Sequence, residues 1–128
     1  MKRLAFVLIM LLTTITGAKA TSSLVCQTQD DNAGIALTMG SVVGSPVLEA
    51  ELYAGSRIWT SMMPKNNIAI AQSFSDNDKI LLDITDNNFE EIIARLRLFV
   101  AHEGEDIISA GTLQVYGLGV FSVSCSDS

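Results

Sequence analysis

From residue 21 onward, hydrophobic and polar positions alternate with a period of two in several short runs. The clearest run places Leu48, Ala50 and Leu52 on one face and Glu49 and Glu51 on the other. Such alternation is typical of a β-strand with one buried face. Strand-like runs cover residues 23–29, 35–39, 47–54, 57–60, 68–74, 80–84, 107–116 and 120–125.

Turn-forming residues separate these runs at short intervals. Gly55–Ser56 suits a two-residue type II′ hairpin turn, and further breaks occur at Asp76–Asp78 and Gly117–Gly119. Consecutive short links imply antiparallel pairing. We therefore predict an all-β fold of about eight strands, arranged as a small antiparallel β-barrel or as a two-layer β-sandwich.

Residues 88–102, NFEEIIARLRLFVAH, fit two interpretations. A short helix over 88–98 would bring the apolar residues of this segment onto one face. A strand would instead place Arg95 and Arg97 together on a solvent-facing side. We favour the strand, because it continues a series of strands spaced at about 8–12 residues, and the helix is the alternative.

The first twenty residues have the plan of a secretory signal peptide. A basic start precedes an unbroken apolar run over 4–12, and Ala18-Lys19-Ala20 has the small residues of a cleavage site. The apolar run is about half of the roughly 20 residues that a membrane-spanning helix needs. We expect residues 1–20 to be removed, which leaves residues 21–128 as a single β domain without membrane insertion.

The only two cysteines, Cys26 and Cys125, lie near opposite ends of this domain. Export places them where thiols oxidise, and two cysteines allow a single intramolecular pairing. A disulfide requires Cα atoms within about 7 Å. We therefore predict a Cys26–Cys125 bridge that clasps the terminal strands, and a periplasmic or secreted location.

Charge limits the classes of partner. Removal of residues 1–20 leaves five basic and fourteen acidic residues, a net charge of −9. Nucleic acids and anionic membrane surfaces are disfavoured, because binding to phosphates rests largely on Lys and Arg. A basic protein partner suits this charge.

Few residues are suited to catalysis. His102 is the only histidine, no serine lies in a G-x-S-x-G elbow, and the cysteines do not form a C-x-x-C pair. The acids cluster in turns such as Asp76–Asp78 without the spacing of a calcium-binding loop. We therefore expect a protein that is not an enzyme, with no catalytic residue, metal site or cofactor.

The most suggestive apolar group is Trp59 with Met62 and Met63, followed by Pro64. It spans the end of a strand and the next loop, where binding residues often lie. Aromatic and methionine side chains are also enriched in the cores of interfaces. We take Trp59, Met62 and Met63 as the candidate binding patch. In the alternative interpretation, Trp59 plugs one end of a barrel and the methionines cover it.

Small size, secretion, acidity, a barrel-like plan and a late cysteine resemble the periplasmic inhibitors of c-type lysozyme. The chain departs from their S-G-x-x-Y loop, because its nearest stretch, Ser109–Thr112, lacks the tyrosine. The resemblance therefore covers the overall plan alone, and no residue role is transferred from it.

These observations lead to one functional prediction with two alternatives. We predict an exported acidic β domain, an inhibitor-like or interaction module, that binds another envelope or extracellular protein. The alternatives are a small-ligand carrier with an apolar cavity inside a miniature barrel and a structural surface component that uses a strand edge. The oligomeric state is left open.

Overall fold

The computed structural model of the chain describes residues 21–40 and 46–127. Within these residues the chain forms nine strands and no helix. The strands are β1 (Thr21–Gln27), β2 (Ala33–Gly40), β3 (Val47–Ala54), β4 (Arg57–Thr60), β5 (Ala69–Ser75), β6 (Lys79–Thr85), β7 (Ile92–Glu103), β8 (Asp106–Val115) and β9 (Gly119–Asp127). The predicted signal peptide, residues 1–20, lies outside the described residues.

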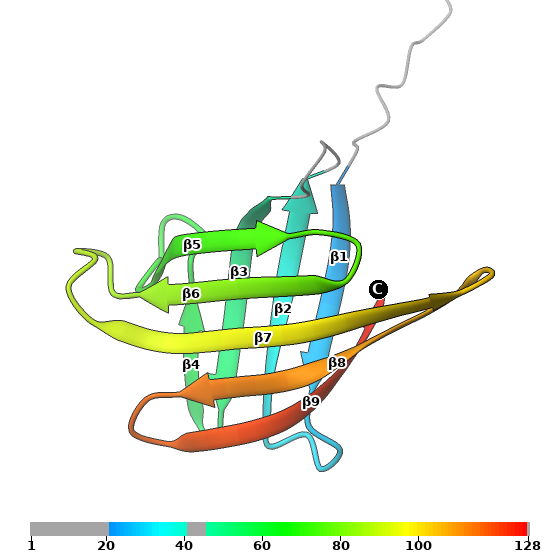
Figure 1. Ribbon diagram of the computed structural model, residues 1–128. Coiled ribbons are helices and arrows are strands. Elements are labelled where there is room, and N and C mark those ends of the chain that lie inside the picture. The colour runs from blue at the N-terminus through cyan, green and yellow to red at the C-terminus, as the bar shows by residue number, and fades with distance from the viewer. Residues whose placement is uncertain (1–20, 41–45, 128) are drawn as a thin grey trace, which may run out of the picture.

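The strands form one antiparallel sheet in the order β4-β3-β2-β1-β9-β8-β7-β6-β5. The sheet curls into a half-barrel, in which β5–β8 run across β1–β4 and β9 lies between the two groups (Figure 1). The predicted all-β fold is confirmed. The structure has features of both predicted arrangements, the barrel and the sandwich. One continuous sheet curls into a half-barrel, and its two halves face each other as layers.

The side chains that point inward from both layers form the core. Period-two alternation sends every second residue of a strand to the same face, and the buried apolar residues join into one cluster. Leu37 and Leu52 contribute from the first layer, and Leu82, Leu96 and Leu113 contribute from the second, all at 0–1% exposure. Burial of this apolar surface is the main stabilising term of the fold.

One disulfide joins the first strand to the last. Cys26 of β1 lies directly opposite Cys125 of β9 in the sheet, and their Cα atoms are 4.0 Å apart. The two residues are 99 positions apart in the chain. The predicted bridge and the predicted contact of the terminal strands are confirmed, and the bridge fastens the layer β1–β4 to the rest of the sheet.

The alternative of a helix over 88–98 is wrong. Residues from Ile92 onward form β7, and Phe89, at a φ of 59°, belongs to the preceding turn and is 63% exposed. The strand buries Ala94 and Leu96 and leaves Arg95 partly exposed. The helix would have required Phe89 in its apolar face, whereas the turn places this side chain in solvent.

Leu48 departs from the predicted alternation. The pairing of β2 with β3 shifts by one residue, so that Thr38 lies opposite Glu49 and Met39 lies opposite Val47. A bulge of this kind reverses the face of the extra residue. Leu48 is consequently 52% exposed, and Val47 takes the inward position.

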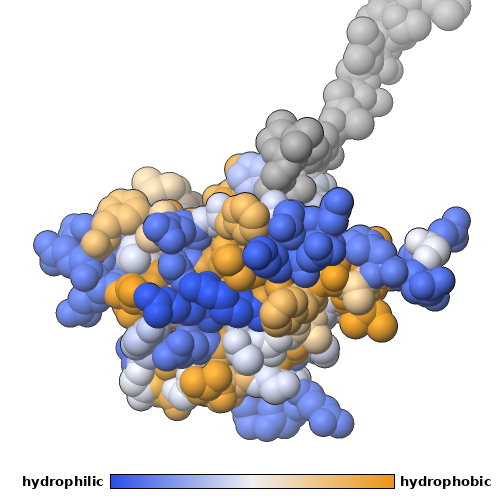
Figure 2. All heavy atoms as spheres, in the orientation of Figure 1, coloured by the Kyte–Doolittle hydropathy of each residue, from blue (hydrophilic) through white to orange (hydrophobic). Residues whose placement is uncertain are grey.

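The β7–β8 hairpin extends beyond the rest of the sheet (Figure 1). Every residue from 101 to 108 is exposed, and the tip carries Glu103, Glu105 and Asp106. This tip forms a hydrophilic end of the molecule in Figure 2. Three of the fourteen acids of the chain thus lie together at this end of the molecule.

Candidate functional site

The short edge strand β4 divides the predicted patch between the interior and the surface. Trp59 points inward and is 8% exposed, whereas Ile58 points outward and is 64% exposed. The guanidinium of Arg57 lies over the indole ring of Trp59, 4.8 Å from its centroid. Trp59 is therefore part of the core, and the structure separates it from the exposed methionines that follow it.

The exposed apolar residues beside β4 form what we call the methionine patch: Ile58, Met62, Met63 and Pro64. Met62 is 39% exposed and Met63 is 78% exposed. The patch lines a surface pocket of about 330 Å³. Ile58 was not among the predicted site residues, although its alternation with Trp59 along β4 indicates that the two face opposite ways.

The side-chain amide of Asn67 caps the outer edge of β4. The Thr60 N–H donates to Asn67 Oδ1 (2.8 Å), and Asn67 Nδ2 donates to the carbonyl of Ile58 (3.5 Å). The Asn67 N–H also donates to the carbonyl of Thr60 (2.9 Å). Open edge groups pair readily with other chains. Asn67 thus occupies backbone groups of β4 that would otherwise be open to strand addition.

The loop that carries the methionines is fastened at both ends. The Ala50 N–H donates to Ser61 Oγ (2.8 Å), and Asn87 Nδ2 donates to the carbonyl of Asn66 (2.9 Å). The first bond ties the loop to β3, and the second ties it to the β6–β7 turn. The methionines are thus carried by a segment that is held in place at both ends.

Acidic side chains flank the methionine patch on β3. Glu49 and Glu51 are exposed on the outer face of this strand. Glu51 lines the pocket of the methionine patch, and both glutamates line a shallow neighbouring depression together with Met62. Lys65 also lines this pocket. The surface therefore combines an apolar centre with a negatively charged flank.

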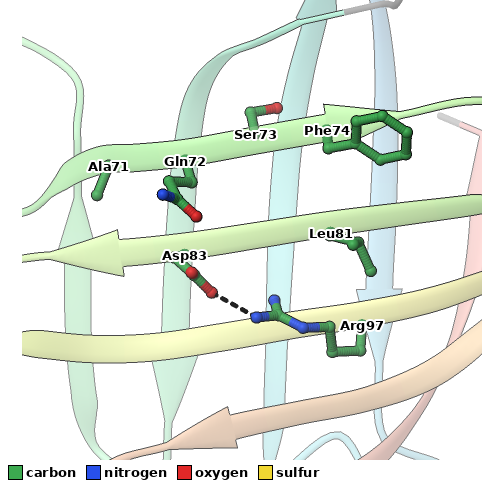
Figure 3. Close-up of a pocket in the computed structure, with 7 residues that line it drawn as sticks. All are labelled: Ala71, Gln72, Ser73, Phe74, Leu81, Asp83 and Arg97. Atoms are coloured by element: carbon green, nitrogen blue, oxygen red, sulfur yellow. Dashed lines mark hydrogen bonds and ion pairs between the residues drawn. The ribbon is translucent and has the colours of Figure 1, made fainter.

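A second surface pocket, of about 460 Å³, lies on the outer face of β5, β6 and β7 (Figure 3). Arg97 reaches Asp83 across the strands at 2.7 Å and also donates to the carbonyls of Leu82 and Leu96. Arg95 Nε lies 3.5 Å from the same carboxylate. The two guanidinium groups and the one carboxylate form what we call the Arg95–Asp83–Arg97 network, which has one positive charge in excess.

His102 lies at the open end of the half-barrel. It lines a pocket of about 200 Å³ together with Ser109 and Asp127. Its Nε2 is 3.0 Å from the carbonyl oxygen of Asn77. A carbonyl only accepts hydrogen bonds, so Nε2 is the donor in this contact. The expectation that the chain is not an enzyme stays a prediction.

The turn acids are engaged with their own backbone. Asp76 Oδ1 accepts the N–H groups of Asp78 and Lys79, both at 2.8 Å, and these bonds to Asp78 and Lys79 lower the pKa of Asp76. A bond from the Thr28 hydroxyl similarly lowers the pKa of Asp30. Among the described residues, no group of three or more His, Cys, Asp or Glu side chains is placed to hold a metal ion.

One polar pair connects two strands and a turn. The Tyr53 hydroxyl donates to the carboxylate of Asp31, and this bond raises the pKa of Tyr53 to about 12. The ring of Tyr53 packs over Gly34, where an added Cβ would lie 2.7 Å from it. The sequence offered no signal for this pair, because it depends on the pairing of β2 with β3.

Comparison of the chain with protein-family models, with curated proteins and with solved structures finds no match. The part of the chain that the structure describes has no helix long and apolar enough to cross a membrane.

Proposed function

We propose that residues 21–128 form an exported interaction domain that binds another envelope or extracellular protein through the methionine patch. The observation that carries this proposal is the exposure of Ile58 on β4 beside Met62 and Met63 on the fastened loop that follows it. Exposed apolar patches commonly mark sites of protein association. Methionine is also well suited to such sites, because its flexible side chain adapts to the shape of a partner.

The charge beside the patch favours a partner with basic residues around an apolar segment. Glu49 and Glu51 would face such basic groups while Met63 contacts the apolar segment. The net charge of −9 would in addition attract a basic partner over a longer range. Electrostatic complementarity of this kind increases the association rate and the specificity of a complex.

The disulfide fits an oxidising compartment, either periplasmic or extracellular. The finer part of the proposal is that residues 1–20 direct export and are cleaved after Ala20. The domain would then act in the same compartment as its partner. The Cys26–Cys125 bridge keeps the two layers together there, where the folded state is exposed to proteases and to varying conditions.

The test uses mature, oxidised residues 21–128 as bait in extracts of the envelope and of the culture medium. The decisive variant is Met63→Glu, which places a charge in the centre of the patch. The matched control is Leu118→Glu, because Leu118 is also an exposed apolar loop residue, at 44% exposure, outside the patch. Trp59→Ala is unsuitable, since it would remove a core side chain.

Capture of a discrete protein by the wild type and by Leu118→Glu, but not by Met63→Glu, would support the proposal. Weaker capture by the double variant Glu49→Gln and Glu51→Gln would support a basic partner. Equal capture by Met63→Glu and the wild type would contradict the assignment of the patch. If no protein is retained, native mass spectrometry for a bound metabolite would test the small-ligand carrier instead.

A further inference from the structure

The outer faces of the two layers carry charges of opposite sign. On the strands of the first layer, the charged residues of the outer face are Glu49 and Glu51. Arg57, at the start of β4, lies over the ring of Trp59 instead. The outer face of the first layer is therefore acidic, and the methionine patch continues it on one side.

The middle of the outer face of β5–β8 is basic and aromatic. It holds three of the five basic residues of the mature chain, Lys79, Arg95 and Arg97, and the carboxylate of Asp83, which contacts both arginines. The acids Glu103 and Asp106 lie apart from it, in the tip of the β7–β8 hairpin. The side chains of Arg95 and Arg97 remain 38% and 39% exposed despite their contacts with Asp83. Figure 2 shows strongly hydrophilic residues across the middle of this face, with hydrophobic residues beside them.

Two exposed phenylalanines border these cations. Phe74 is 50% exposed and lies under the ammonium of Lys79, which is 5.8 Å from the ring centroid. Phe99 is 76% exposed and lies opposite Lys79 in the pairing of β6 with β7. We call this surface, made of Phe74, Lys79, Arg95, Arg97 and Phe99, the basic aromatic face.

We propose that the basic aromatic face of one copy of this chain binds the methionine patch and its glutamates on a second copy. The inference rests on the proposed function, because it names the partner of the methionine patch. Lys79 and Arg95 of one copy carry positive charges that complement the negative charges of Glu49 and Glu51 on the other. Phe74 and Phe99 supply aromatic rings, with which methionine sulfur makes favourable contacts.

The geometry makes this association head-to-tail. The two surfaces lie on the outer sides of opposite layers (Figure 1), so one copy cannot pair both of its surfaces with the same neighbour. An open assembly therefore has a free methionine patch at one end and a free basic aromatic face at the other. A contact between different surfaces generates a ring if the rotation closes and an open chain if it does not.

The net charge of −9 opposes assembly, because copies repel each other at long range. This repulsion is screened beyond about 8 Å at physiological ionic strength. The complementary pairs act at shorter range. Association should consequently be weak at very low salt, stronger at moderate salt, and weak again when high salt screens the pairs themselves.

The test is sedimentation velocity of mature, oxidised residues 21–128 across a wide range of concentrations. The sedimentation coefficient of the wild type should rise with concentration past the value of a dimer. Glu49→Lys with Glu51→Lys reverses the acidic surface. Lys79→Glu with Gln114→Glu places two carboxylates in the basic surface. Gln114 lies opposite Arg95 in the pairing of β7 with β8, so its replacement adds a negative charge beside the Arg95–Asp83–Arg97 network and leaves its three members in place. Each pair of substitutions alone should weaken association by about tenfold or more.

The decisive measurement is whether association is restored when both surfaces are reversed together. The variant that carries all four substitutions has both surfaces reversed, so its association should return toward that of the wild type. Thermal melting followed by circular dichroism shows whether each variant is folded. A monomer at every concentration and salt, or association that ignores the charge reversals, would overturn the inference. Loss of capture by Met63→Glu in extracts would in that case leave the proposed function standing with a different partner.

Discussion

The outer face of β1–β4 and the outer face of β5–β8 are built on the same pleat but present different chemistry. The first carries Glu49 and Glu51 and continues into the methionine patch. The second carries the Arg95–Asp83–Arg97 network and exposed phenylalanines. Their inward faces, by contrast, are both lined by apolar residues that join into one core. The buried side chains of the two layers thus form one core that stabilises the fold. The exposed side chains of each layer differ in charge and in aromatic content.

The two layers also differ in how they are held. The first layer ends at β4, whose edge is capped by Asn67 and whose loop is fastened to β3. The second layer extends into the exposed β7–β8 hairpin. Cys26 and Cys125 join the two at the β1–β9 pairing. Substitutions at these sites should therefore show how much each of them contributes to the free energy of unfolding.

Removal of the disulfide should have the largest effect on stability. We expect Cys26→Ser with Cys125→Ser to lower the free energy of unfolding by roughly 4 kcal/mol, because the bridge closes a loop of about 100 residues. Guanidinium denaturation of the variant and of the oxidised wild type measures the difference. A loss below about 1 kcal/mol would show that the β1–β9 pairing holds the layers together without the bridge.

Substitutions of Trp59 and Met63 should differ in their effect on stability, because Trp59 is buried in the core and Met63, four positions later, is exposed. Trp59→Ala should cost about 3 kcal/mol, because it empties a buried aromatic site. Met63→Ala should change stability by less than about 0.5 kcal/mol, since its side chain is exposed. The same denaturation experiment compares them. Equal destabilisation by both would contradict the placement of Met63 at the surface.

Gly34 should be intolerant of a side chain. We expect Gly34→Ala to destabilise the fold by about 1–3 kcal/mol, because the added Cβ meets the Tyr53 ring and the carbonyl of Cys26. Gly55→Ala is an informative comparison, since no atom lies within 4 Å of its added Cβ and only its φ of 60° opposes the change. Thermal melting should show the larger loss for Gly34→Ala.

Tyr53 should make stability depend on pH in the alkaline range. Its pKa is raised from an ordinary value near 10 to about 12 by the bond to Asp31. The contribution is therefore complete below about pH 10 and is lost as the pH rises through 12. Denaturation of Tyr53→Phe beside the wild type between these values tests this, and parallel pH curves would contradict it.

The alternating pattern predicted most of the strands, because every second side chain of a strand points to the same face and the inward face is buried. Arg95 and Arg97 alternate with buried residues in β7, and this alternation correctly favoured the strand over the helix. The bulge at Leu48 was not predictable, since a one-residue slip leaves the pattern of the chain unchanged and alters only its pairing. The disulfide was predictable, because only one pairing of two cysteines exists.

The candidate site was predicted in part. Met62 and Met63 lie at the surface beside β4, but grouping by proximity in sequence also brought in Trp59, which faces inward. Strict use of alternation would have selected Ile58 instead. The Asp83–Arg97 pair joins residues 14 positions apart, and it follows from the register of β6 against β7. No local sequence signal specifies that register.

The most direct test of the account is photo-crosslinking from the methionine patch. A photo-reactive amino acid is placed at position 63 in one sample and at position 118 in a matched sample, and both are irradiated in envelope and culture extracts. We expect a discrete protein adduct from position 63 and none from position 118. If copies of the chain associate head-to-tail, the adduct is a second copy of the chain. Equal labelling from both positions, or none from position 63, would contradict the assignment of this surface as the binding site.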